Sequence, residues 1–333
     1  MATVGARPVV IDTDPGVDDA LAILLALRSP ELALVGGTTV CGNVPVEQAT
    51  RNLYRVLQVA GSASTDTLAI GRGAAAPLSR PLETAAHVHG PDGVGELDRF
   101  VETDGRPRYP PPVVPSTHPD SLDVWAQCLR RYPHDLTLVT LGPLTNLAVA
   151  LARRPYLVWG FRSIVAMAGA IAVPGNVTPA AEYNAYADPE AAAQVLEAGL
   201  PFTLVPLDVT GRVAMTRTQI ARLTKGSRDP VCRFFGDATG HALDFAERVE
   251  GKAVFPFHDP LAVAVMVDPS LVRCKPLHVE VETRGRVTRG ATVADRRPRA
   301  EAFRRPPNVS VTMWVDVVRS LARLKERLCP GSS

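Results

Sequence analysis

A concentration of carboxylates lies close to the N-terminus, in the segment Asp12-Thr13-Asp14-Pro15-Gly16-Val17-Asp18-Asp19. Four aspartates within eight residues repel one another, and a bound cation is the usual means of neutralising such charge in a partly buried place. Ligands that are all oxygen favour Ca²⁺ or Mg²⁺ over zinc or copper. The Pro15-Gly16 pair predicts a tight turn into a helix whose dipole favours acidic residues in its first turn. The segment therefore predicts a divalent-cation site.

Two later segments carry further groups suited to chemistry. His258-Asp259 precedes an apolar stretch, so it offers an imidazole and another carboxylate at the start of a helix. Glu182 and Asn184, with Asn176 upstream, form a polar loop of the kind that contacts hydroxyl-rich ligands. Each pattern by itself also fits a helix cap, a turn or a surface pair. The N-terminal aspartates make both segments candidates for one site.

Alternating strands and helices position these residues. Continuously apolar strands separated by helices indicate a parallel sheet covered on both faces, and right-handed crossovers make it doubly wound. The fold class is therefore α/β, with one doubly wound, mostly parallel sheet flanked by helices. The expected strands are residues 8–11, 32–39, 136–141, 163–167 and 202–206, and the expected helices are residues 18–28, 46–59, 144–153 and 189–198.

The carboxyl ends of the expected strands carry the polar residues. Ligands of open α/β sheets bind outside these ends, so we expect the site there. The residues concerned follow four different strands: the N-terminal aspartates, Thr39 and Asn43, Thr145 and Asn146, and Met167 with Asn176, Glu182 and Asn184.

The rest of the chain is expected to complete a single domain over residues 1–333. The proline-rich residues 103–121 predict a loop insertion, because the alternation of strands and helices resumes directly afterwards. Residues 211–260 are expected to be mostly helical, with the longest helix at 231–249. A strand pair around 277–292 and a last helix at 313–328 follow. Trp125, Trp159 and Trp314 are expected to pack in the core.

Bulk properties exclude several classes of protein. A formal net charge of +2 gives no overall attraction to nucleic acid or anionic membrane. Five scattered cysteines without a CxxC pair argue against a disulfide framework and a thiolate zinc site. No signal peptide is evident, and the apolar run at residues 20–27 is too short to cross a bilayer. A cytoplasmic enzyme is the expectation.

The sequence resembles the calcium-dependent nucleoside hydrolases of the inosine–uridine-preferring type, over nearly the whole chain. The aspartate-rich opening is the most specific of the shared motifs, and the others follow it in family order. These motifs are Asp12–Ala20, Thr38–Asn43, His87–Gly90, Leu141–Asn146, Asn176 with Ala181–Asn184, Asp188–Ala192, His258–Pro260 and Thr292–Asp295.

The resemblance implies a role for each matching position. It implies that Asp14 is the general base and a Ca²⁺ ligand, together with Asp19, Asp259 and the main-chain carbonyl of Leu141. It implies that His258 serves the departing base. The positions that the resemblance assigns to the substrate, most of them to the ribose, are Asp18, Asn43, Met167, Asn176, Glu182, Asn184 and, on a flap over the sugar, His87.

The implied reaction is hydrolysis of the N-glycosidic bond of ribonucleosides to free base and ribose. Ca²⁺ activates water that Asp14 deprotonates, and attack opposite the base inverts the anomeric carbon. The helical residues 211–260 are implied to border the base pocket, with His241, Asp244 and Phe245 as candidates. The interrupted glycine pattern around Ala168–Ala170 and the proline-rich loop leave the base preference open.

Two other interpretations compete with this one. The first is a non-catalytic nucleoside- or ribose-binding protein on the same scaffold, although Asp14, Asp19 and Asp259 are all present. The second is a Mg²⁺-dependent phosphatase of the haloacid-dehalogenase type, which the Pro15-Gly16 turn disfavours. Relatives in the resembling family form homodimers or homotetramers, and the sequence does not decide between them.

Overall fold

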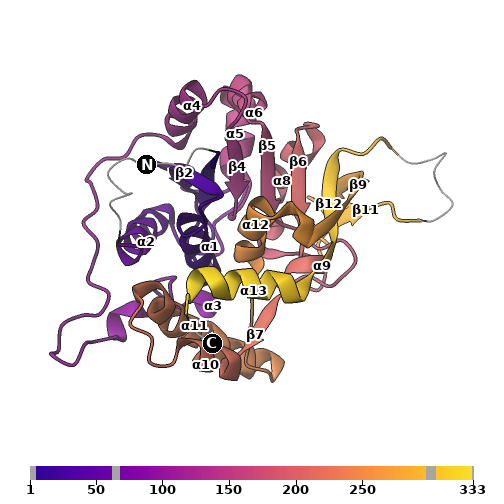
Figure 1. Cartoon of the computed structure of the whole chain (residues 1–333). Helices are drawn as coiled ribbons and strands as arrows, with labels where there is room; N and C mark the ends of the chain where they lie inside the picture. The colour runs from indigo at the N-terminus through magenta and orange to yellow at the C-terminus, as the bar shows by residue number, and fades with distance from the viewer. Residues whose placement is uncertain (1–4, 62–67, 298–304, 332–333) are drawn as a thin grey trace.

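A central sheet of eight strands organises the chain in the computed structural model, which describes residues 5–61, 68–297 and 305–331 (Figure 1). The strand order is β3-β2-β1-β4-β5-β6-β12-β9, and only β9 runs antiparallel to its neighbour. This confirms the predicted α/β class and the mostly parallel sheet. The strands are β1 (Arg7–Thr13), β2 (Leu32–Thr39), β3 (Ala69–Arg72), β4 (Thr137–Thr140), β5 (Ser163–Met167), β6 (Phe202–Val205), β9 (Val272–Leu277) and β12 (Val309–Val315).

The two faces of the sheet pack against different helices. Because side chains alternate along a strand, Val9 and Ile11 of β1 enter one core cluster and Val10 enters the other. The first cluster includes residues of α1 (Val17–Leu27), α2 (Val46–Val59), α12 (His258–Val267) and α13 (Val317–Leu328). The second includes residues of α4 (Ser121–Arg131), α5 (Thr145–Arg153), α6 (Pro155–Gly160) and α8 (Pro189–Glu197).

The topology creates a switch point at β1. The chain leaves β1 toward β2 and β3 on one side, and later returns to build β4, β5 and β6 on the other. Loops that follow β1 and β4 therefore diverge and leave a crevice at the carboxyl ends of the strands. The turn after β1 enters α1, whose residues 17–26 are all buried, including Asp18 and Asp19 in its first turn. The sheet thus carries the aspartates into the place where a ligand is expected.

The C-terminal region differs from the prediction. The expected helix at residues 313–328 is wrong at its start, because Val309–Val315 is strand β12 and the helix begins at Val317. Asp316 separates the two elements by accepting a hydrogen bond from the Arg319 N–H at 3.1 Å. The strand pair is confirmed as β10 (Val279–Val281) and β11 (Thr292–Ala294), whereas β3, α4 and β9 were not predicted.

Residues 211–260 contain the expected helices together with an unexpected strand pair. The long helix is α11 (Pro230–Glu250), preceded by α10 (Arg217–Thr224). Strands β7 (Ala214–Thr216) and β8 (Val254–Pro256) pair antiparallel and bring the ends of this region together. Figure 1 shows α10 and α11 at one side of the molecule, away from α4 and α6.

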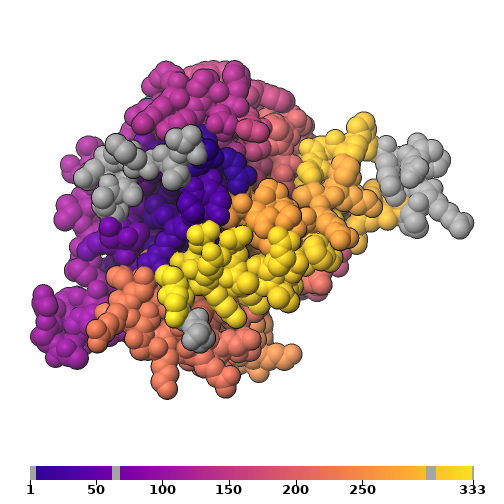
Figure 2. Space-filling model, in the orientation of Figure 1, coloured from indigo at the N-terminus to yellow at the C-terminus, as the bar shows by residue number. Residues whose placement is uncertain are grey.

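The spacing of the cysteines argued against a disulfide framework, and the structure contradicts this by forming one disulfide. A disulfide joins Cys232 in α11 to Cys329, which directly follows α13, across 97 residues of sequence. Spacing along the chain gave no sign of this pair, because only the packing of α13 against α11 brings the two side chains together. Figure 2 shows α13, in yellow, on the surface of the molecule.

Among the described residues, none of the helices combines the length and apolar character needed to cross a membrane.

The three tryptophans differ in burial. Trp125 is buried and donates its indole N–H to Thr38 Oγ1 at 3.1 Å, as expected for a core residue. Trp159 and Trp314 are exposed, so the prediction of core packing is wrong for both. Trp314 lies next to the last residue of β12, and the guanidinium of Arg273 lies over its ring.

Candidate active site

Three carboxylates from distant parts of the chain meet at the carboxyl ends of the strands. Asp18 and Asp19 come from the first turn of α1, and Asp259 comes from the first turn of α12, which packs against α1. Each offers a ligand oxygen, and these oxygens lie within 4.8 Å of one another. The structure therefore brings together two segments, around residues 18–19 and 259, that are about 240 residues apart in the sequence.

Asp14 lies beside this group in a cradle made by two glycines. Its Oδ2 accepts a hydrogen bond from the Asn43 N–H at 2.6 Å, while its Oδ1 is buried without a hydrogen-bond partner among the described residues. A Cβ added at Gly42 would overlap Oδ2, and one added at Gly142 would lie 2.6 Å from Oδ1. Only glycine at these two positions leaves room for the carboxylate.

The resemblance implies that Asp14 is the general base. On that expectation Gly42→Ala should lower kcat by about 100-fold or more, because small displacements of a reacting group cost rates of this order. The added methyl group must push Asp14 or Pro143 away from its present place. Steady-state kinetics with a nucleoside, the substrate that the resemblance implies, measure the effect. Gly160→Ala is the matched control, because its Cβ would meet only the flexible end of Leu129, at 3.2 Å. Equal activity of both variants would contradict the role of the cradle.

Asp19 is fixed by three donors. It accepts hydrogen bonds from the Thr13 hydroxyl at 2.5 Å, the Gly16 N–H at 2.9 Å and the Asn43 side-chain amide at 3.1 Å. Asn43 therefore holds Asp14 through its main chain and Asp19 through its side chain. A carboxylate constrained on several sides is pre-organised for binding.

The electrostatics of the cluster fit a divalent cation. Burial and then repulsion from Asp19 raise the pKa of Asp18 to about 8. The pKa of Asp14 is raised by the same two causes, and the pKa of Asp259 by burial and then repulsion from Asp18 and Asp19. A cation would remove this repulsion, and it would give a partner to Oδ1 of Asp14, which has none within the described part of the chain. The all-oxygen donor set suits Ca²⁺ or Mg²⁺.

The segment at residues 182–184 binds the ends of two strands, β4 and β5, at the site. Glu182 caps the short helix α7 (Tyr183–Ala187) and accepts hydrogen bonds from the N–H groups of Asn184 and Gly169, at 2.8 and 2.7 Å. The Asn184 amide donates to the carbonyls of Leu141, at 2.6 Å, and Met167, at 3.0 Å. The predicted Leu141 carbonyl thus lies at the site and already accepts one hydrogen bond.

Two predicted residues lie farther out. Asn176 is exposed, and its side-chain oxygen accepts a hydrogen bond from the Tyr183 N–H at 3.0 Å. His87 belongs to the short helix α3 (Ala86–His89) and is also exposed, with its ring 5.3 Å from that of Phe245 on α11. Neither contacts the carboxylates in this structure.

His258 is held next to Asp259 by a residue that the sequence did not indicate. Its Nδ1 lies 2.8 Å from the hydroxyl of Thr210 in α9 (Leu207–Thr210). Burial, followed by the neighbouring His89, lowers the pKa of His258 to about 4. The imidazole is therefore neutral at physiological pH and fixed in orientation.

Sequence reasoning also missed the role of His89 and the surroundings of Asp12. His89 is buried, its Nδ1 accepts a hydrogen bond from the Val17 N–H at 3.1 Å, and it lies 3.9 Å from Asp18. Asp12 accepts from Thr38 at 2.5 Å and Asn146 at 2.8 Å, so it links strands β1 and β2 to α5. Burial raises the pKa of Asp12 to about 7. The motif around His87 gave the only signal for His89.

A doubly wound sheet with a buried acidic cluster at its switch point defines an α/β protein whose ligand site lies at the carboxyl ends of the strands. Residues 9–322 match the family described as inosine-uridine preferring nucleoside hydrolase. The chain belongs to this family and is a hydrolase of N-glycosyl compounds.

Relatives and solved structures agree with this assignment. The chain is 38% identical over 312 residues to the non-specific ribonucleoside hydrolase RihC of Klebsiella pneumoniae, covering 93% of this chain and 94% of the relative. It resembles a plant nucleoside hydrolase, PpNRh1, with a TM-score of 0.85 and 33% identity over 97% of this chain and 99% of the other. The purine-preferring ribonucleoside hydrolase of Gardnerella vaginalis gives a TM-score of 0.84, 31% identity, and coverage of 97% and 98%.

Proposed function

We propose that this enzyme hydrolyses the N-glycosidic bond of ribonucleosides to ribose and free base, with a bound divalent cation and Asp14 as general base. The observation that carries the proposal is the meeting of Asp18, Asp19 and Asp259 beside an Asp14 whose Oδ1 has no partner among the described residues. The names of the relatives support the substrate class, because they include ribonucleoside hydrolases.

The cation would be held by Asp14, Asp19 and Asp259, with the Leu141 carbonyl completing the set and Asp18 at its edge. When bound, a divalent cation supplies positive charge that neutralises these carboxylates and makes a neighbouring water more acidic. Ca²⁺ is the cation we propose, since its flexible coordination accepts several carboxylates and a main-chain carbonyl. Because an oxygen of Asp18 lies within 4.8 Å of oxygens of Asp19 and Asp259, Asp18 can also contribute a ligand to the cation.

The residues around the cluster bind and orient the substrate. Asp14 takes the proton of the attacking water through Oδ1, to which no described residue donates a hydrogen bond, while Asn43 holds its other oxygen. Asp18, Asn43, Glu182 and Asn184 present carboxylate and amide groups for the ribose hydroxyls, and Asn176 and His87 would join them if the outer loops close. Attack from the side of Asp14, opposite the base, inverts the anomeric carbon.

His258 is placed to serve the departing base. It is partly buried directly before Asp259, and its Nδ1 lies 2.8 Å from the hydroxyl of Thr210. An oriented imidazole can hydrogen-bond to the base as the glycosidic bond breaks and negative charge develops on the base. The oxocarbenium character of the ribose at this stage is stabilised by the surrounding carboxylates.

An assay of free ribose tests the proposal. The protein is incubated with inosine or uridine in the presence of Ca²⁺, and reducing sugar is measured over time. We expect ribose release that stops on addition of a chelator and resumes when Ca²⁺ is restored. Binding of nucleoside without ribose release would instead identify a binding protein, and phosphate release from phosphomonoesters without action on nucleosides would identify a phosphatase.

A further inference from the structure

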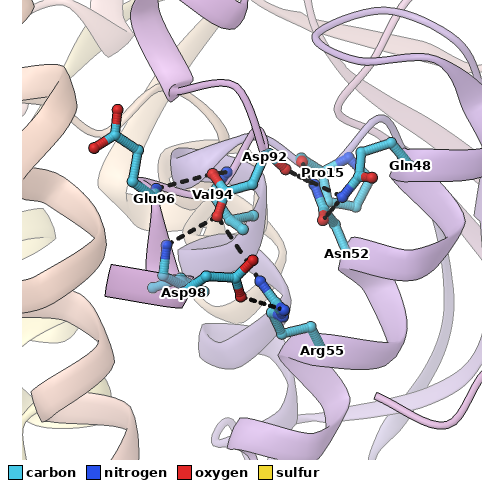
Figure 3. A network of polar contacts seen from close by, with 9 residues as sticks. Pro15, Gln48, Asn52, Arg55, Asp92, Val94, Glu96 and Asp98 are labelled. Carbon is cyan, nitrogen blue, oxygen red and sulfur yellow. Dashed lines mark hydrogen bonds and ion pairs between the residues drawn. The ribbon is translucent and has the colours of Figure 1, made fainter. Parts of the chain in front are cut away.

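A buried asparagine on α2 joins the turn between β1 and α1 to the loop that follows α3. Asn52 is 0% exposed. Its Nδ2 donates to the Pro15 carbonyl at 3.0 Å and to the Asp92 carbonyl at 2.9 Å, and its Oδ1 accepts from Gln48 Nε2 at 2.8 Å. Figure 3 shows the Asn52 side chain directed toward Pro15 and Asp92. Both hydrogens and the oxygen of the amide are therefore used.

The surroundings permit a single orientation of this amide. The carbonyls of Pro15 and Asp92 can only accept hydrogen bonds, so the NH2 group of Asn52 must face both of them. On the opposite side, Gln48 lies one helical turn earlier on α2 and donates to the oxygen. A flipped amide would place its oxygen against two carbonyls and its NH2 group against the donor of Gln48. The direction of the Asn52 donors is thus fixed before any ligand binds.

The Asp92 carbonyl belongs to a turn that is closed on itself. The Asp92 carboxylate accepts hydrogen bonds from the N–H groups of Val94, Glu96 and Leu97, at 3.0, 2.8 and 2.9 Å (Figure 3). A turn held by three such bonds keeps its carbonyl in place. Asn52 is therefore anchored at Asp92, and its second donor holds the turn between β1 and α1.

The Pro15 carbonyl is part of the peptide that aims a donor at Asp19. This peptide is planar, so its C=O and the N–H of Gly16 point in opposite directions and rotate together. Asn52 holds the C=O at 3.0 Å, and the Asp19 carboxylate accepts the N–H at 2.9 Å. Proline has no N–H, so the carbonyl is the main-chain group of Pro15 that a neighbour can hold. Asn52 thus sets the direction of the Gly16 N–H.

The same peptide sets the spacing of the carboxylates. Gly16 is the N-cap of α1, and Asp19 in the first turn of this helix accepts the hydrogen bond from its N–H. Asp14 lies directly before the peptide. Without Asn52 the buried Pro15 carbonyl would lose its partner, which favours rotation of the peptide toward another donor. Such a rotation would turn the Gly16 N–H away from Asp19 and change the distance between Asp14 and Asp19.

We propose that Asn52 is a positioning residue of the cation site, which fixes the peptide between Pro15 and Gly16 and thereby holds Asp14 and Asp19 at the spacing that the cation requires. This inference rests on the proposed function, because it concerns the cation proposed there. Asn52 lies behind the carboxylates, and its amide is occupied by main-chain carbonyls and Gln48. It keeps the ligands in place before the cation binds, which reduces the rearrangement that binding needs.

Titration of the metal-free protein with Ca²⁺ in a calorimeter tests this role. Asn52→Leu keeps the approximate size of the side chain and removes its hydrogen bonds. We expect the Kd for Ca²⁺ to rise by about 10- to 100-fold, the range for residues that hold a metal ligand in place. The Ca²⁺ concentration for half-maximal ribose release from inosine should rise by the same factor. At saturating Ca²⁺, kcat should stay within about fivefold of the wild-type value, because excess ligand restores the population of the binding-competent arrangement.

Asn308→Leu is the matched control. The Asn308 amide donates to the carbonyls of Leu196 at 3.0 Å and Val279 at 2.9 Å, and its oxygen accepts the Val279 N–H at 2.8 Å. Asn308 directly precedes β12, which runs parallel to β6, so it lies at the edge of the sheet opposite the site. Both leucine variants should lower the Tm of the metal-free protein, and only Asn52→Leu should weaken Ca²⁺ binding.

A second variant covers the case in which leucine prevents folding. Asn52→Ser keeps one hydroxyl donor in the same place, so its Kd for Ca²⁺ should lie between those of the wild type and Asn52→Leu. Unchanged Ca²⁺ affinity in the Asn52 variants would overturn the inference. Equal weakening in Asn308→Leu would show a general effect of lost stability and would also overturn it, as would a kcat that saturating Ca²⁺ does not restore.

The wild-type protein distinguishes failure of the inference from failure of the proposed function. If the metal-free wild type binds no Ca²⁺, the proposed cation fails and the inference fails with it. If the wild type binds Ca²⁺ but releases no ribose, the proposed reaction fails, and the calorimetric comparison of Asn52→Leu with Asn308→Leu still decides the inference. If the wild type binds Ca²⁺ and releases ribose while Asn52→Leu binds Ca²⁺ equally well, only the inference is overturned.

Discussion

Asp14→Asn is expected to lower kcat by about 1000-fold or more, within the range that a general base contributes. The asparagine keeps the size of the side chain and can still accept the hydrogen bond that Asn43 donates to Oδ2. It cannot accept a proton from water, and it places an amide group at the position of Oδ1, which no residue in the described ranges contacts by a hydrogen bond. Single-turnover measurement of ribose release under saturating substrate is the direct test.

A second measurement separates catalysis from folding in this variant. Burial and the nearby Asp19 raise the pKa of Asp14, so its ionised form destabilises the metal-free protein. Removing the charge should therefore raise the Tm of the metal-free protein while turnover disappears. The exposed Asp135, paired with Arg162 at 2.9 Å, provides the control Asp135→Asn, which should change neither property. Turnover near the wild-type rate in Asp14→Asn would remove Asp14 from the mechanism.

The metal-free protein is expected to lose stability as the pH rises from about 4 to about 8, with a fall in Tm of at least about 5 °C. The pKa of Asp18 is about 8 in the folded protein, and those of Asp14 and Asp259 are also raised. In the unfolded chain these groups ionise near pH 4. Between these limits the folded state binds more protons than the unfolded state, so stability is greatest at low pH and declines as the folded carboxyls ionise.

Ca²⁺ should reverse this trend, because it binds the ionised carboxylates and competes with protons. We expect the increase in Tm on adding Ca²⁺ to be larger at pH 8 than at pH 5.5. At a concentration 1000 times Kd the stabilisation amounts to about 4 kcal/mol. Differential scanning fluorimetry with and without chelator measures both trends. Asp19→Asn should lose most of the response, whereas a Tm that ignores Ca²⁺ at pH 8 would argue against a cation at this cluster.

Local patterns determined much of the scaffold. The helix at residues 46–59 and the strands at 32–39 and 163–167 have the predicted bounds, because apolar periodicity and flanking turn residues are properties of neighbouring positions. The β12–α13 boundary was misjudged: the predicted helix began at residue 313, inside strand β12, whereas the helix begins at Val317. Only pairing with β6 and β9 makes the first part a strand.

The sequence by itself identified the acidic turn, the later His258-Asp259 pair and the polar segment around Glu182. Each of these groups consists of reactive or polar residues that are close together in the sequence, so it can be recognised without knowledge of the fold. Tertiary structure alone decided that Asp18 lies with Asp19 and Asp259, that Gly42 and Gly142 make room for Asp14, and that Cys232 bonds to Cys329. Such contacts depend on how whole helices pack across the sheet, and packing is a long-range property that no local pattern encodes.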